Sequence, residues 1–198
     1  MGVEERMADR CNTIRLYSFQ TDVVYQVLKR DGVCYSKEEY VRKKYKESAK
    51  VFINAYGWFV KEAQHIVPKP EGAEYPYWAF TDLYNVDQTG DGHVLTLDVQ
   101  IGEAILFDMF DWTKIMQMHY IGENESEEAT FSEELKNMGM NEFQIMTSNF
   151  YPEQKARIQE SWKRLFGHQQ AIEAGDNSGV HSVQAGLWCI KDEWIVKE

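Results

Sequence analysis

The chain has 198 residues, which suits one domain, and 43% of them are hydrophobic, which supplies enough apolar surface for a sizeable core. A formal charge of −11 repels phosphate backbones, so direct nucleic-acid binding is not expected. The sequence holds no apolar run long enough to span a bilayer and no signal-peptide core, so we expect a cytoplasmic protein without membrane contact.

Residues 15–20 carry β-type side chains and predict a first strand. Thr21 is placed to cap a helix that ends at Gly32. Four apolar residues share one face of this predicted helix: Val23, Val24, Val27 and Leu28.

Ser36 and Glu39 have the spacing of a capping box, which predicts a helix start there. From 41 to 63, apolar residues recur every three or four positions, as in an amphipathic helix with a break near Gly57. Pro68 ends this segment, because proline cannot continue a helix.

The middle of the chain predicts three strands, over 75–83, 93–99 and 104–107, with a turn-rich loop over 85–92. A helix follows the third strand, and either Asp108 or Asp111 can cap it.

Pro152 suits the first turn of a later helix, and Gly167 is its expected end. The segment 182–190 predicts a last strand, in which Val183, Ala185, Leu187 and Cys189 share one face and Gln184 and Trp188 the other. Helices and strands alternate without a regular βαβ order, so we expect an α+β fold. We predict a short extension at 1–13 and a single domain over 14–198, with a small, twisted, mostly antiparallel sheet and flanking helices.

The residues from Asp87 to Asp98 match a calcium-binding loop in their spacing of oxygen ligands. The ligands of this alternative would be Asp87, Thr89, Asp91 and Asp98. An EF-hand needs helices on both sides, whereas strand-like segments flank this loop. A plain strand connection is therefore the preferred interpretation, and no metal site is expected.

The three cysteines, Cys11, Cys34 and Cys189, are far apart and form no CxxC pair, so a thiolate zinc site is not expected. No GxSxG elbow and no phosphate loop is present, so the catalytic residues and the question of whether the chain is an enzyme stay open. Ligand pockets combine aromatic rings with a few polar groups. Six residues fit this description and are our candidate ligand contacts: Gln20, Tyr77, Trp78, Ser161, Trp162 and Gln184. Packing in the core is the alternative role for the tryptophans among them.

Several segments in order resemble a known family: 16–20 (LYSFQ), 75–79 (YPYWA), 94–99 (VLTLDV), 104–112 (AILFDMFDW), 160–166 (ESWKRLF) and 183–190 (VQAGLWCI). The chain is similar to the bacterial domain-of-unknown-function family numbered 3841. The resemblance runs from about Ile14 to Val196. It implies a fold and a gene family rather than an activity.

A weaker resemblance, at the level of fold, is to ADP-ribosyltransferases, which bind NAD in a cleft between two small sheets. Ser18 stands where those enzymes usually place a His, and Cys189 lies near the position of their Glu. The resemblance implies a nucleotide-binding cleft, with NAD as a possible cofactor and altered or lost catalysis. The alternative is a non-enzymatic module whose acidic surface binds a protein partner.

Overall fold

The computed structural model describes residues 12–45 and 49–197. Its main sheet is antiparallel, and its strand order is β4-β1-β3-β6-β5. These strands are β4 (His93–Gln100), β1 (Thr13–Gln20), β3 (Tyr77–Phe80), β6 (Val183–Leu187) and β5 (Ile105–Asp108). A two-stranded sheet joins β2 (Val33–Tyr35) to β7 (Cys189–Lys191).

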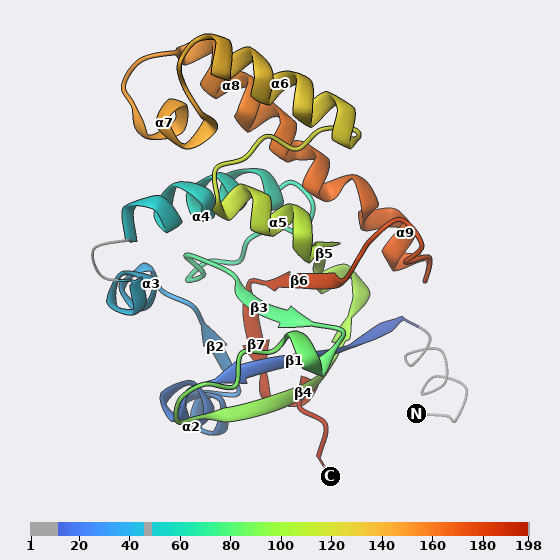
Figure 1. Cartoon of the computed structure of the whole chain (residues 1–198). Coiled ribbons are helices and arrows are strands. Elements are labelled where there is room, and N and C mark those ends of the chain that lie inside the picture. Colours follow the sequence, from blue (N-terminus) through green and yellow to red (C-terminus); the bar gives the residue numbers. More distant parts are fainter. Residues whose placement is uncertain (1–11, 46–48, 198) are drawn as a thin grey trace.

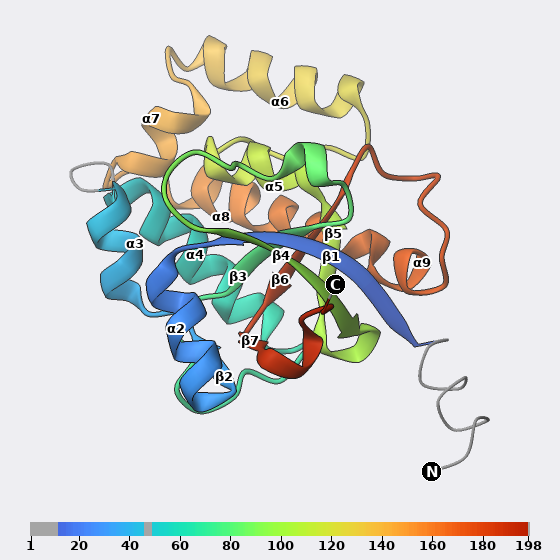
Figure 2. The same cartoon turned by 90° about the horizontal axis from the view of Figure 1, so that it is seen from below.

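The described α-helices are α2 (Asp22–Asp31), α3 (Glu38–Tyr45), α4 (Ala49–Ala63), α5 (Met109–Met116), α6 (Glu125–Asn137), α7 (Glu142–Thr147), α8 (Pro152–Ser161) and α9 (Gln169–Glu173). Short 3₁₀ turns add η2 (Leu83–Asn85), η3 (Ile101–Glu103), η4 (Trp162–His168) and η5 (Asp192–Trp194). In Figure 1, α4 and α5 lie over the sheet, and α6 and α7 lie farther from it. Figure 2 shows the same arrangement from below, with α6 again at the outside. The predicted α+β class is therefore confirmed.

The sheet separates two apolar cores. One fills the space between the sheet and the helices, and Phe59, Trp112 and Trp162 belong to it. The other lies on the opposite face and includes Leu16 and Leu97. Aromatic rings of the first core meet edge to face, as do Phe59 and Trp112 with centroids 5.3 Å apart. Such pairs add about 0.5–1.5 kcal/mol each beyond the area they bury.

Gly186 allows the sheet and α4 to come close together. A Cβ built at this position would lie 2.8 Å from the ring of Phe59, which is fully buried. A side chain at 186 would therefore force the Phe59 ring to shift.

The last predicted strand is divided in two, because Trp188 lies between β6 and β7. The predicted faces hold nevertheless: Val183, Ala185, Leu187 and Cys189 belong to one core, and Trp188 belongs to the other. Its indole donates to the carbonyl of Val67 at 2.8 Å.

Several local predictions need correction. Thr21 is the N-cap of α2, but its side chain makes no capping hydrogen bond, and Val23 is 62% exposed rather than buried. Ser36 belongs to a bridge with Tyr75, and the N–H of Glu38 donates to the Glu74 carboxylate instead of to a capping box.

The two predicted glycine interruptions are also wrong. Gly57 lies inside α4 without a break, because a glycine in a helix interior costs only about 1 kcal/mol, which burial of neighbours such as Phe59 offsets. Gly167 does not end the helical run, since η4 continues through it into α9. In the described ranges no helix is both long and apolar enough to cross a membrane.

Candidate functional site

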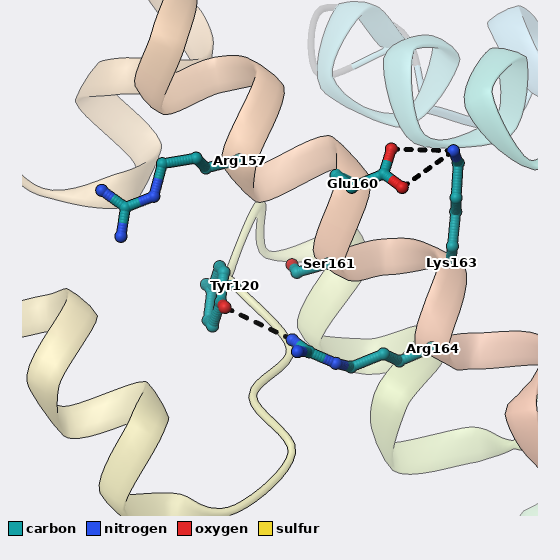
Figure 3. A pocket seen from close by; sticks show the side chains of 6 residues that line it. All are labelled: Tyr120, Arg157, Glu160, Ser161, Lys163 and Arg164. Carbon is teal, nitrogen blue, oxygen red and sulfur yellow. Dashed lines mark hydrogen bonds and ion pairs between the residues drawn. The ribbon is translucent and has the colours of Figure 1, made fainter.

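A hollow of about 520 Å³ opens beside α8, and we call it the α8 pocket. Its walls come from the segment before α6, from α8 and from the start of η4. The lining residues are Tyr120, Arg157, Glu160, Ser161, Lys163 and Arg164 (Figure 3). The chain has 32 acidic residues against 21 Lys and Arg, yet three cations gather in this one hollow.

Arg157 forms one side of the α8 pocket and is held by α6. Its two terminal nitrogens donate to the Glu134 carboxylate at 2.5 and 3.0 Å. Its guanidinium also lies 4.7 Å from the centre of the Phe131 ring. The bidentate ion pair keeps the pKa of Glu134 below its ordinary value, and the hydrogen bond from Arg157 is the largest cause.

Arg164 and Tyr120 face each other in the pocket (Figure 3). Arg164 donates to the carbonyl of Ile121 at 2.6 Å and to the Tyr120 hydroxyl at 3.3 Å. That hydroxyl donates in turn to Glu127 at 2.6 Å, which is the first cause of the lowered pKa of Glu127. The direct contacts of Arg164 with Glu127 and Glu123 are longer, at 3.3 and 3.4 Å.

Lys163 is paired with Glu160 at 2.7 Å, one turn back along the same helical run. In Figure 3 this pair lies apart from the Tyr120–Arg164 contact. The side chains of Lys163 and Arg164 are 50% and 33% exposed, so both cations can reach a ligand from solvent.

The predicted contacts Ser161 and Trp162 lie at and behind this pocket. The Ser161 hydroxyl donates to the carbonyl of Ile158 at 2.7 Å and accepts from the N–H of Ile121 at 3.0 Å. Trp162 is fully buried, and its indole donates to the carbonyl of His119 at 2.6 Å. Ser161 therefore shapes the pocket wall, and Trp162 supports it from the core.

Trp78 and Gln184 come together on the helix-covered face of the sheet, on the paired strands β3 and β6. The Trp78 indole donates to the Tyr56 hydroxyl at 2.9 Å and packs against Trp112 with centroids 4.8 Å apart. Gln184 is 4% exposed.

Gln20 and Tyr77 do not join either group. Gln20 donates to Ser18 at 2.8 Å. Tyr77 belongs to the opposite core, where its hydroxyl lies 3.1 Å from the sulfur of Cys34 and burial raises its pKa. The six predicted residues are thus divided among three places, and their role as ligand contacts stays a prediction.

A carboxylate–imidazole pair at the end of β5 was not predicted. Asp108 accepts from the backbone N–H groups of Phe110 and His181 at 3.0 Å each, and its Oδ2 lies 2.8 Å from His181 Nδ1. The Asp108 side chain is 5% exposed and that of His181 is 74% exposed. Burial opposes ionisation of Asp108, but the hydrogen bonds from His181, Phe110 and Ser182 outweigh it and lower its pKa. Asp108 is the N-cap of α5, as its position before that helix predicts, whereas no sequence pattern indicates that His181 lies beside it.

Asp87 and Asp98, which would bind calcium in the alternative loop, are already hydrogen-bonded within the protein. Asp87 accepts from the N–H and the hydroxyl of Thr89, and Asp98 lies on β4 in a bidentate pair with Arg15 at 2.6 and 2.9 Å. Among the residues that the structure describes, no group of three or more His, Cys, Asp or Glu side chains could hold a metal ion. Cys34 and Cys189 are buried, and Cys11 lies outside the described residues.

One comparison with known proteins identifies the family. The family model described as Domain of unknown function (DUF3841) matches residues 15–196, nearly the whole chain. The chain belongs to this family. The match confirms the resemblance inferred from the ordered segments. Neither the curated proteins nor the solved structures give a match.

Membership in DUF3841 supplies no activity and no site residues. The cations of the α8 pocket, Arg157, Lys163 and Arg164, were not singled out from the sequence, although the segment 160–166 was part of the family resemblance.

Proposed function

We propose that this DUF3841 protein binds a small, phosphate-bearing ligand of the nucleotide class in the α8 pocket. The observation that carries the proposal is that Arg157, Lys163 and Arg164 all line one 520 Å³ hollow of a strongly acidic chain. Guanidinium groups donate two parallel hydrogen bonds to phosphate, and a cluster of them suits a multiply charged anion.

The internal ion pairs do not close the site to such a ligand. Exposed ion pairs contribute about 0–1 kcal/mol, and the contacts of Arg164 with Glu123 and Glu127 are long, at 3.4 and 3.3 Å. A phosphate carries more negative charge than a carboxylate and can accept two parallel hydrogen bonds from one guanidinium, so it can displace these long contacts. Arg157 keeps its shorter bidentate pair with Glu134 and forms the fixed wall of the site.

A test compares the binding of inorganic pyrophosphate, ADP, NAD and adenosine by calorimetry. We expect the three anions to bind and adenosine not to bind. Replacing Arg164 with Gln should weaken binding by about ten- to a hundredfold, because one charge-assisted interaction is lost. Arg30→Gln is the matched control, since Arg30 is exposed and paired with Asp31 on α2. Equal affinity of both variants would refute the proposal.

NAD falls within this ligand class because it carries a pyrophosphate, so the proposal retains NAD as a ligand. It also retains a cytoplasmic location. The relation to ADP-ribosyltransferases stays a hypothesis. The proposal includes no transfer chemistry: Ser18 is fully buried and donates to the carbonyl of Trp78, and burial raises the pKa of the Cys189 thiol to about 11.

Exposed apolar side chains near α7 favour the alternative of a protein partner. Phe143, Phe150 and Met138 are 48%, 74% and 41% exposed, and Glu133 on the preceding helix α6 is 65% exposed. Partner capture through an acidic surface should weaken strongly between low and physiological salt, because the screening length falls to about 8 Å. Capture that is indifferent to salt and to a Phe150→Ser change would contradict this second proposal.

A further inference from the structure

Gln184 occupies the middle of a row of side chains that crosses the main sheet. The strand register places five residues side by side on one face: Thr96, Tyr17, Phe80, Gln184 and Phe107. Directly paired side chains of neighbouring strands lie about 5 Å apart. The Gln184 amide is therefore flanked by two phenyl rings, Phe80 on β3 and Phe107 on β5.

The Gln184 amide has no hydrogen-bond partner among the described residues, although Gln184 is only 4% exposed. Gln169 shows the ordinary situation of a buried glutamine. It is 6% exposed, accepts from the N–H of Leu106 and donates to the carbonyl of Ala104. A buried polar group normally finds such partners, because leaving it unpaired costs free energy.

The unpaired amide still touches the surface. Within the described ranges, no fully enclosed side-chain nitrogen or oxygen lacks a partner, so the amide atoms of Gln184 must keep a small contact with solvent. Tyr17 and Phe80, which lie on the β1 side of Gln184, are half-buried. Trp78, two residues before Phe80 on the same face of β3, is half-buried as well. The amide thus lies in a row with half-buried aromatic side chains.

We propose that Gln184, with Phe80 and Tyr17 beside it, binds a planar heterocycle whose edge carries a hydrogen-bond donor next to an acceptor. An amide offers one acceptor and two donors in a plane, so it pairs with a lactam or amidine edge through two hydrogen bonds. Aromatic neighbours stack on a planar ring and exclude water from those bonds. The Trp78 indole N–H is already bound to Tyr56, so the Gln184 amide is the group here that can pair with a donor and an acceptor on one edge of a ring.

This site is separate from the α8 pocket, because none of its residues lines that pocket. It requires no phosphate on the ligand, so the two sites can be tested independently.

The experiment uses the full chain and three uncharged probes: hypoxanthine, adenine and uracil. Ligand-observed NMR measures their binding, and 1-methylhypoxanthine, in which a methyl group replaces the N1–H donor beside the O6 acceptor, is the matched probe. We expect at least one base to bind saturably and hypoxanthine to bind about tenfold better than its methylated form, as expected from the loss of one hydrogen bond.

Two variants separate recognition from structure. Gln184→Met removes an unpaired amide, so binding should fall by about tenfold or more while the melting temperature stays unchanged or rises. Gln169→Met removes a paired amide and should lower the melting temperature. Arg164→Gln should leave base binding unchanged, which distinguishes this site from the α8 pocket. The inference is overturned if none of the bases binds, if Gln184→Met binds them as the parent does, or if it loses stability as Gln169→Met does.

Discussion

Replacing Asp108 with Asn tests the hydrogen bonds that join the end of β5 to the segment before β6. One carboxylate oxygen accepts from Phe110 and the other from the backbone and ring of His181. In Asn, one of these oxygens becomes an NH₂ group, which cannot accept. One backbone N–H then loses its acceptor, so we expect the free energy of unfolding to fall by about 1–3 kcal/mol.

The effect should depend on pH in a defined direction. The folded-state pKa of Asp108 is below its ordinary value, so its contribution is present above the unfolded pKa of about 3.9 and is lost as pH falls through the folded pKa. The difference in unfolding free energy between the parent and Asp108→Asn should therefore be constant near neutral pH and shrink at the acid end.

Asp111 gives the matched control on the same helix. Burial is the main cause that raises its pKa, against the opposing charge of Lys114, so its ionised form is disfavoured in the folded state. Asp111→Asn should leave stability at neutral pH unchanged or slightly raised, and the difference should vanish as pH falls below its ordinary pKa. Urea unfolding at pH 7, 5 and about 3.5 measures both variants. Equal losses for Asp108→Asn and Asp111→Asn would refute the reasoning.

Three further outcomes follow from the structure. Gly186→Ala should lower the free energy of unfolding by about 1–3 kcal/mol in urea titrations, because its Cβ would lie 2.8 Å from the Phe59 ring. Thiol labelling at neutral pH, mapped by mass spectrometry, should reach Cys189 only on unfolding, since it is 7% exposed and its pKa is raised to about 11 by burial; rapid native labelling would contradict its placement. Calcium and a chelator should leave the melting temperature of the parent unchanged, because Asp98 is paired with Arg15; a calcium-dependent rise would restore the loop as a site.

Periodicity predicts much of this fold because each element buries one face. The alternation of Leu95, Leu97 and Val99 is enough to define β4, and all three are buried. Pro152 correctly marks the start of α8. The errors fall where tertiary contacts decide the outcome. Ser36 has the spacing of a cap, but the bridge to Tyr75 competes for this segment.

The candidate site is harder to predict, because its residues are distant in the sequence. Tyr120 and Arg164 meet only when the segment before α6 packs on η4, and His181 meets Asp108 across 73 positions. The chemistry of Gln184 and Trp78 makes them candidate ligand contacts, and strand pairing brings them onto one face. Gln20 carries the same amide group, but it lies on the opposite face of the sheet, where it donates to Ser18. The pairing register decides which face a strand residue occupies.

The most direct test of the proposed function follows the arginine side-chain Nε–H signals by NMR during a titration with inorganic pyrophosphate. The structure predicts that the Arg164 signal shifts saturably, while that of Arg30, which is paired with Asp31 far from the α8 pocket, stays in place. An Arg164 signal that does not move, or an equal shift of Arg30, would contradict a phosphate-binding pocket beside α8.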